Sequence, residues 1–166
     1  MAELTNLESK LGEVVGLAMA AQEAGQKVAK LAKEDGNEEL VGTLERMREQ
    51  AKETEERGTQ VAGSFEGKKT AILEEAREVK GKAQEMMKTY LDEASDALDG
   101  FEFLTMAEAG EVGHWEILGT LNKRAANSDV SELVAWALPI QQQHLEVVRS
   151  TSLKLAAEED PNEPAE

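Results

Sequence analysis

The sequence predicts an all-α fold in a single domain, and three observations carry this prediction. Proline occurs only three times in 166 residues, twice after residue 160, so little interrupts a helix. Apolar residues recur with a period close to 3.6 in five long segments, as on one face of a helix. No segment alternates apolar and polar residues in the manner of a strand. A chain of this length can bury a sizeable core.

The first two predicted helices, 4–34 and 38–65, form a hairpin. Gly36 fits the residue that ends a helix, and Asn37 can cap the next one. In the first helix Gly12 and Gly16 lie one turn apart, so a neighbouring backbone can approach closely. The apolar face of the second helix comprises Leu40, Leu44, Met47, Val61 and Phe65, with small or polar residues between them.

A third helix is expected over 70–91, after a break at Gly67. A fourth and a fifth follow over 98–126 and 130–157. Between them Ser128 or Asp129 can cap, and Glu132 completes an Asp-x-x-Glu capping box.

The predicted helical domain covers 1–157. The remaining residues, 158–166, are acidic, contain two prolines and have almost no apolar side chains. Such a composition cannot bury enough apolar surface to fold, so we expect this tail to be disordered.

Charge and composition exclude several classes of function. The formal net charge of −16 disfavours nucleic acids and anionic membranes as partners, because both need basic surfaces. Cysteine is absent, which excludes disulfides and thiolate-based metal sites. There is no glycine-rich phosphate loop. No apolar run approaches the roughly 18 residues of a membrane span, and the N-terminus lacks a secretory pattern, so a cytoplasmic protein is expected.

Two histidines mark the candidate site. On a helical wheel, Glu111 and His114 fall within the apolar face of the fourth helix, three residues apart. Gln141 and His144 repeat this spacing on the fifth helix. With the turn centred between Asn127 and Ser128, an antiparallel pairing sets Glu111 level with His144, and His114 level with Gln141.

This arrangement predicts a transition-metal site. Glu111, His114 and His144 make a two-histidine, one-carboxylate set, which suits Fe(II), and manganese or zinc are further candidates. Gln141 would be a ligand or a supporting donor. Glu53 or Glu55 of the second helix could complete the site.

The same residues also fit a second interpretation without metal. Glu111 could pair with His144, and His114 with Gln141, as a buried polar layer that fixes the register of the helices. The protein would then be a helical interaction or structural module. The residues leave both an enzymatic and a non-enzymatic role open.

Several short motifs resemble a known family. They are Glu53-Thr54, Gly67-Lys68-Lys69, His114-Trp115-Glu116 and Gly119-Thr120-Leu121. In this order they resemble the bacterial stress-associated ferritin-like family of unknown function, over most of 4–157. The resemblance implies an antiparallel four-helix bundle with an additional helix inserted between its two hairpins, and a homodimer. It also implies an iron-handling or oxidative-stress role.

Overall fold

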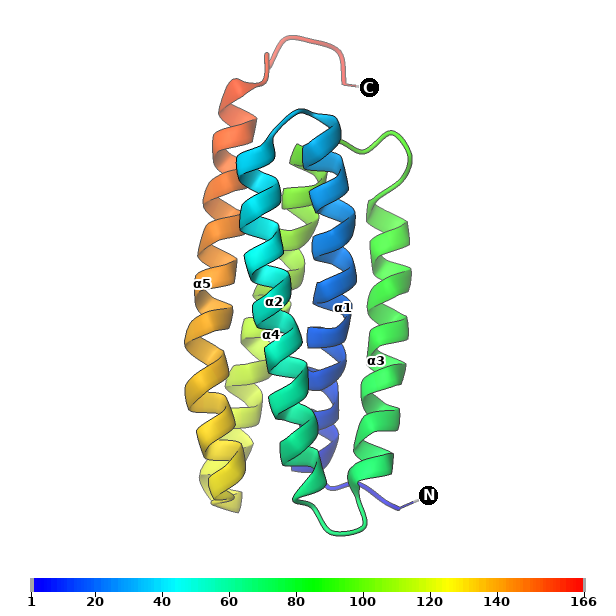
Figure 1. The fold of residues 1–166 in the computed structure, drawn as a ribbon, viewed down its shortest axis with the longest axis vertical. Helices are drawn as coiled ribbons and strands as arrows, with labels where there is room; N and C mark the ends of the chain where they lie inside the picture. Colours follow the sequence, from blue (N-terminus) through cyan, green and yellow to red (C-terminus); the bar gives the residue numbers. More distant parts are fainter. Residues whose placement is uncertain (1, 166) are drawn as a thin grey trace.

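The computed structural model describes residues 2–165 and folds them into five helices, with no strand in that range. The helices are α1 (Asn6–Glu34), α2 (Glu38–Gly63), α3 (Lys69–Tyr90), α4 (Ala97–Ala125) and α5 (Ser128–Glu158) (Figure 1). The predicted all-α class is confirmed. Met1 and Glu166, the outer ends of the predicted domain and tail, lie outside the described residues.

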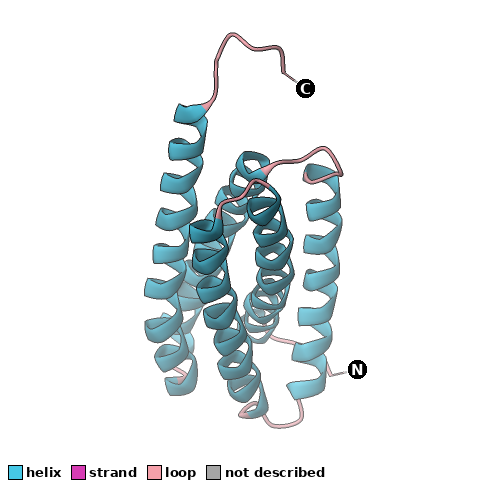
Figure 2. Cartoon of the chain, turned by 45° about the horizontal axis from the view of Figure 1, so that its top comes forward, coloured by secondary structure: helices cyan, strands magenta, loops and turns pink. Residues whose placement is uncertain are grey.

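Four of the helices pack around a common core, and α3 lies outside them. α1 and α2 form one antiparallel hairpin, and α4 and α5 form the other. α1 packs against α4, α2 packs against α5, and α3 contacts chiefly α1. Figures 1 and 2 both place α3 at the edge of the molecule, where it carries the chain from one end of the bundle back to the other. No helix within residues 2–165 is long and apolar enough to cross a membrane.

The first hairpin has the predicted end signals. Gly36 adopts a φ of 74°, in the region that favours glycine, and the Asn37 side chain accepts a hydrogen bond from the Leu40 N–H. At the start of α1, Thr5 and Glu8 form a reciprocal capping box. These contacts pair backbone groups that the helix ends would otherwise leave without partners.

The second hairpin turns earlier than predicted. Asn127 caps α5, its side chain accepting from the Val130 N–H, so the expectation of Ser128 or Asp129 is wrong. Asn122 closes the turn by accepting from the Asn127 N–H and donating to the Asn127 carbonyl. Only Ala126 and Asn127 therefore lie between α4 and α5. This short turn changes which residues of the two helices face each other.

Two apolar clusters fill the core at different heights. One is built around Trp115 and Leu118 of α4, and the other around Phe101 and Leu104, nearer the start of that helix. The part of α4 between them, from Glu108 to Glu111, carries buried carboxyl groups. Buried carboxyl groups thus separate the two apolar clusters along α4.

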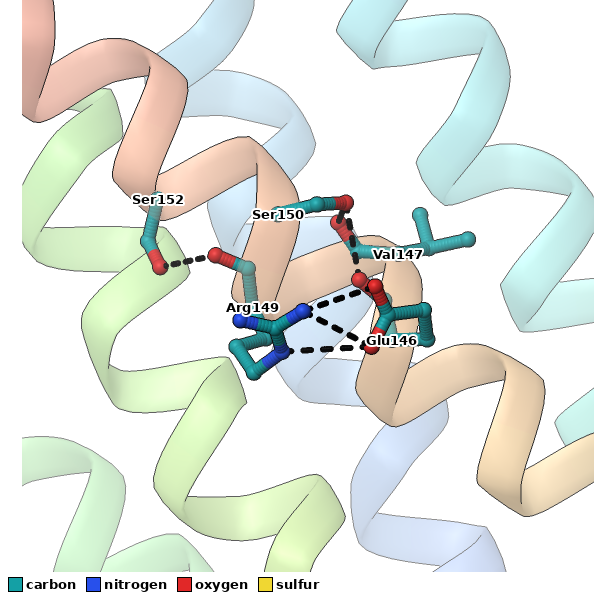
Figure 3. A network of polar contacts seen from close by, with 5 residues as sticks. All are labelled: Glu146, Val147, Arg149, Ser150 and Ser152. Atoms are coloured by element: carbon teal, nitrogen blue, oxygen red, sulfur yellow. Dashed lines mark hydrogen bonds and ion pairs between the residues drawn. The ribbon is translucent and has the colours of Figure 1, made fainter.

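A network of local polar contacts lies in the second half of α5, between Glu146 and Ser152. Figure 3 shows Arg149 paired with Glu146 at 2.8 Å, and the Ser150 hydroxyl donating to the Val147 carbonyl at 3.1 Å. The Ser152 hydroxyl donates to the Arg149 carbonyl. Because Glu146 and Arg149 are exposed, their ion pair adds little stability, and we assign no further role to this network.

Gly12 and Gly16 allow α1 and α3 to touch backbone to backbone, as predicted. A Cβ atom at Gly12 would lie 2.7 Å from the Ile72 carbonyl oxygen, and one at Gly16 would lie still closer to the Ala76 carbonyl. Real Cβ atoms do not approach a backbone oxygen so closely. Small residues at these two positions are therefore a condition for the seating of α3.

A pair of glycine substitutions tests this contact. We expect Gly16→Ala to lower the free energy of unfolding by about 1–3 kcal/mol through overpacking. Gly81→Ala in α3 is the control, because nothing lies within 4 Å of its added methyl group. It should stabilise the protein by up to about 1 kcal/mol. Urea unfolding measures both, and equal gains would contradict the close packing of α1 on α3.

Candidate functional site

A layer of polar side chains crosses the middle of the bundle. Its members, which we call the polar layer, are Gln50, Glu108, Glu111, Gln141 and His144. The last four are buried, with exposed fractions of 3% for Glu108, 5% for Glu111, 6% for Gln141 and 5% for His144. Gln50 belongs to α2, whereas the four buried residues belong to α4 and α5. The layer therefore joins the two hairpins.

Three contacts connect the layer. The Gln141 amide donates to the Glu108 carboxyl group. His144 Nε2 lies 2.7 Å from Gln50 Oε1. Because an amide oxygen only accepts, Nε2 carries a proton and donates it to Gln50. The other ring nitrogen, Nδ1, faces Glu108 Oε2 at 3.8 Å. Glu108 is thus the centre of the layer, between both polar groups of α5.

Burial favours the neutral form of every titratable group in the layer. It raises the pKa of Glu108 to about 8, against a smaller lowering by the hydrogen bond from Gln141. Burial also raises the pKa of Glu111 well above its ordinary value, and the nearby Glu108 charge adds to the effect. The pKa of His144 falls to about 4, again through burial. Near neutral pH, Glu108 and His144 therefore form a neutral contact and no ion pair.

His114 lies apart from this layer. Its Nδ1 is 3.0 Å from Glu13 Oε2 and 3.3 Å from Lys10 Nζ, both on α1, and its side chain is 37% exposed. Six residues of α-helix rotate a side chain by about 120°, which separates His114 from Glu108 around α4. Glu111 points between them. The structure thus brings Glu111 and His144 into one layer but leaves His114 outside it.

The register of the second hairpin differs from the prediction. Gln141 and His144 both face Glu108, whereas the sequence pairing set His144 level with Glu111 and Gln141 level with His114. Because α5 begins at Ser128, the turn is centred one residue earlier than expected. Each α5 residue then faces a position two residues earlier on α4. This shift sets His144 level with Ala109 and Gln141 level with Val112, and the Gln141 side chain contacts Glu108 a further turn along α4, so the predicted pairing is wrong.

The two acidic candidates of α2 also lie outside the layer. Glu53 is half-exposed and pairs with Arg57 at 2.9 Å. Glu55 accepts a hydrogen bond from Gln22 of α1. The layer instead uses Gln50, one turn earlier on α2.

Sequence reasoning overlooked Glu108 and Gln50. The signal for Glu108 was available, since Glu108 and Glu111 are three residues apart and share one side of α4. Gln50 stands among the charged residues Arg48, Glu49 and Lys52, and no pattern in the sequence distinguishes it.

The donors do not fit the predicted metal set. A metal ion needs three or more donors that converge, yet Gln141 is bound to Glu108, His144 to Gln50, and His114 lies against α1. Within residues 2–165, no group of three histidine, aspartate or glutamate side chains could hold a metal ion. The arrangement favours hydrogen bonding over metal coordination.

Comparison with known proteins gives no match. No family model, no curated protein and no solved structure is similar to this chain.

The raised pKa values predict a pH dependence of stability. A native carboxyl group with a raised pKa stabilises the fold at low pH, and this stability is lost as pH rises from about 4.5 through about 8 for Glu108. His144 has a lowered pKa and acts in the opposite direction, destabilising the fold as pH falls from 6.5 towards about 4. Between pH 6.5 and 8 the carboxyl groups therefore dominate. The free energy of unfolding should fall there by up to about 1.4 kcal/mol per pH unit for each group.

Urea unfolding at three pH values between 6.5 and 8 measures this slope. In Glu108→Gln one titrating group is removed while a hydrogen-bonding amide remains, so the decline should be shallower. Glu116→Gln is the matched control, because Glu116 is exposed on the same helix and should leave the slope unchanged. A wild-type slope equal to that of Glu108→Gln would contradict the buried, protonated carboxyl group.

Proposed function

We propose that this chain is a metal-independent helical interaction protein, in which the polar layer holds the two hairpins in one register. The observation that supports this proposal is the set of contacts around His144 and Glu108. Each polar group of α5 in the layer is already matched to a group on α2 or α4. A slip of one turn would leave a buried carboxyl group and an imidazole without partners, at a cost of about 1–3 kcal/mol for each group.

We further propose a ferritin-like relationship for the bundle. Two antiparallel hairpins joined by one long crossover are the topology of ferritin-like folds. Here α3 lies in the crossover between α2 and α4, in agreement with the inserted helix that the motif resemblance implies. The polar layer occupies the core of the bundle, the region where such folds build metal sites.

Thermal unfolding with and without metal tests metal independence. Binding at 100 times Kd would stabilise the native state by about 2.7 kcal/mol. For a chain of this size that corresponds to a rise in Tm of roughly 5–10 °C. We expect changes below about 1 °C with Fe(II) under anaerobic conditions, Mn(II), Zn(II) or a chelator.

A rise in Tm that survives in His114→Gln but disappears in His144→Gln would instead establish a metal site in the polar layer. The iron-handling or oxidative-stress role implied by the resemblance would then replace our proposal. A rise that disappears only in His114→Gln would indicate metal bound near the surface of α1 and α4.

A strip on α4 supports self-association as the interaction. Between residues 103 and 115 the only acidic side chains, Glu108 and Glu111, are buried, so the outer face of α4 carries no carboxylate between the exposed Glu102 and Glu116. Its residues, which we call the α4 strip, are Met106, Ala109, Gly110, Gly113 and Ile117. Because each copy carries a net charge of −16, an uncharged strip is a surface on which two copies can meet with little repulsion.

Sedimentation measurements test the homodimer. We expect a reversible dimer that Ile117→Glu weakens at least tenfold, since the substitution places a charge within the α4 strip. Leu153→Glu, at another exposed apolar residue on α5, is the control and should not alter assembly. A monomer at all concentrations, or equal effects of the two variants, would rule out the α4 strip as the contact.

A further inference from the structure

A cavity of about 220 Å³ lies between α1, α3 and α4, on the side of the polar layer opposite α5. Alanine and methionine side chains make up much of its wall, among them Ala21, Ala83, Met87 and Ala107. An apolar cavity of about 150 Å³ is large enough to bind benzene. By the same scale this cavity accepts roughly nine non-hydrogen atoms.

Glu111 lines this cavity, and its carboxyl group has no hydrogen-bond partner among the described residues. Among residues 2–165 no side chain or backbone group forms a hydrogen bond or ion pair with its carboxyl group, although the residue is 5% exposed. Glu108, which also lines the cavity, already accepts from Gln141. Among the described residues only Glu74 has a fully enclosed side-chain oxygen without a partner, so the Glu111 oxygens retain contact with the space of the cavity.

Positive charges near the cavity are already paired. Lys10, beside His114 at the edge of the cavity, forms an ion pair with Glu13. Lys80 pairs with Glu23 at 2.9 Å. The cavity is therefore lined by the carboxyl groups of Glu108 and Glu111, by His114 and Gln84, and otherwise by mostly apolar side chains. No lysine or arginine of the described residues forms an ion pair with Glu111.

We propose that this cavity binds a small amphipathic amine, with the ammonium group against Glu111 and the apolar body among the alanine and methionine side chains. An ammonium group supplies hydrogen-bond donors, and its positive charge favours the ionised form of a carboxyl group that burial otherwise keeps neutral, so the two can form charge-assisted hydrogen bonds. An anion would meet two carboxyl groups, and a bare metal ion would lack converging ligands. The methionines suit a ligand of irregular shape, because their side chains are flexible and polarizable.

The entrance lies between α3 and α4. Met86 and Met106, from opposite sides, both line the cavity and are exposed to solvent. Since α3 packs chiefly on α1, side-chain movements at these methionines can open the cavity without disturbing the four-helix core. Met106 and Gly110 of the α4 strip also line the cavity, so self-association through that strip would restrict the entrance. The inference does not depend on the metal-independent function proposed above.

Calorimetric titration with three matched probes tests the site. The probes are 2-phenylethylamine as its ammonium ion, 2-phenylethanol, and 3-phenylpropionate, which share an aromatic body and differ in the charge of the head group. We expect saturable binding of the ammonium ion, at least tenfold weaker binding of the alcohol and none of the carboxylate. Glu111→Gln should weaken ammonium binding at least tenfold and leave alcohol binding nearly unchanged, because it removes charge but little volume.

Two further variants complete the test. Glu116→Gln changes the net charge by the same amount on the exposed face of α4, and should bind like the wild type. Ala107→Leu fills the cavity and should abolish binding of both the amine and the alcohol. Circular dichroism confirms that each variant is folded. No saturable binding of the ammonium ion, equal affinity for the alcohol, or unchanged affinity in a folded Glu111→Gln protein would overturn the proposal.

Discussion

The organisation of this bundle depends on keeping the Glu108 carboxyl group neutral and hydrogen-bonded in the core. Burial alone would make a charge at this position very costly. Gln141 and His144, both from α5, surround the group, and Gln50 holds His144 from α2. We propose that this one acidic residue on α4 restricts the register of α5 and α2 more than the less directional apolar contacts of the two clusters on either side do.

α3 packs closely on α1 but leaves a cavity on the side that faces α4. α1 accommodates α3 through Gly12 and Gly16, so this pair is tight, whereas the side of α3 that faces α4 leaves the apolar cavity. Glu111 lies where the polar layer meets this cavity. The same short segment of α4 therefore supplies both the group that we propose fixes the register and the group that faces the cavity, one helical turn apart.

The sequence predicts the helices more fully than it predicts the contacts of the polar layer. Helix limits and the glycine contact follow from local rules, as Gly36, Asn37 and Gly16 show. The register does not, because moving the turn by a single residue shifts every α5 partner by two positions on α4. Packing between helices likewise decides which side of α4 faces α5 and which faces α1. For this reason Glu108 contacts α5, whereas His114 contacts α1.

The most direct test of the central claim is an NMR titration of the side chains in the polar layer, using ¹³C-labelled glutamate and ¹⁵N-labelled histidine. The account predicts that Glu108 keeps its proton until about pH 8, and that His144 stays neutral, with the proton on Nε2, down to about pH 4. A Glu108 carboxyl group that is ionised at pH 6, or a His144 ring that titrates near 6.5, would contradict it.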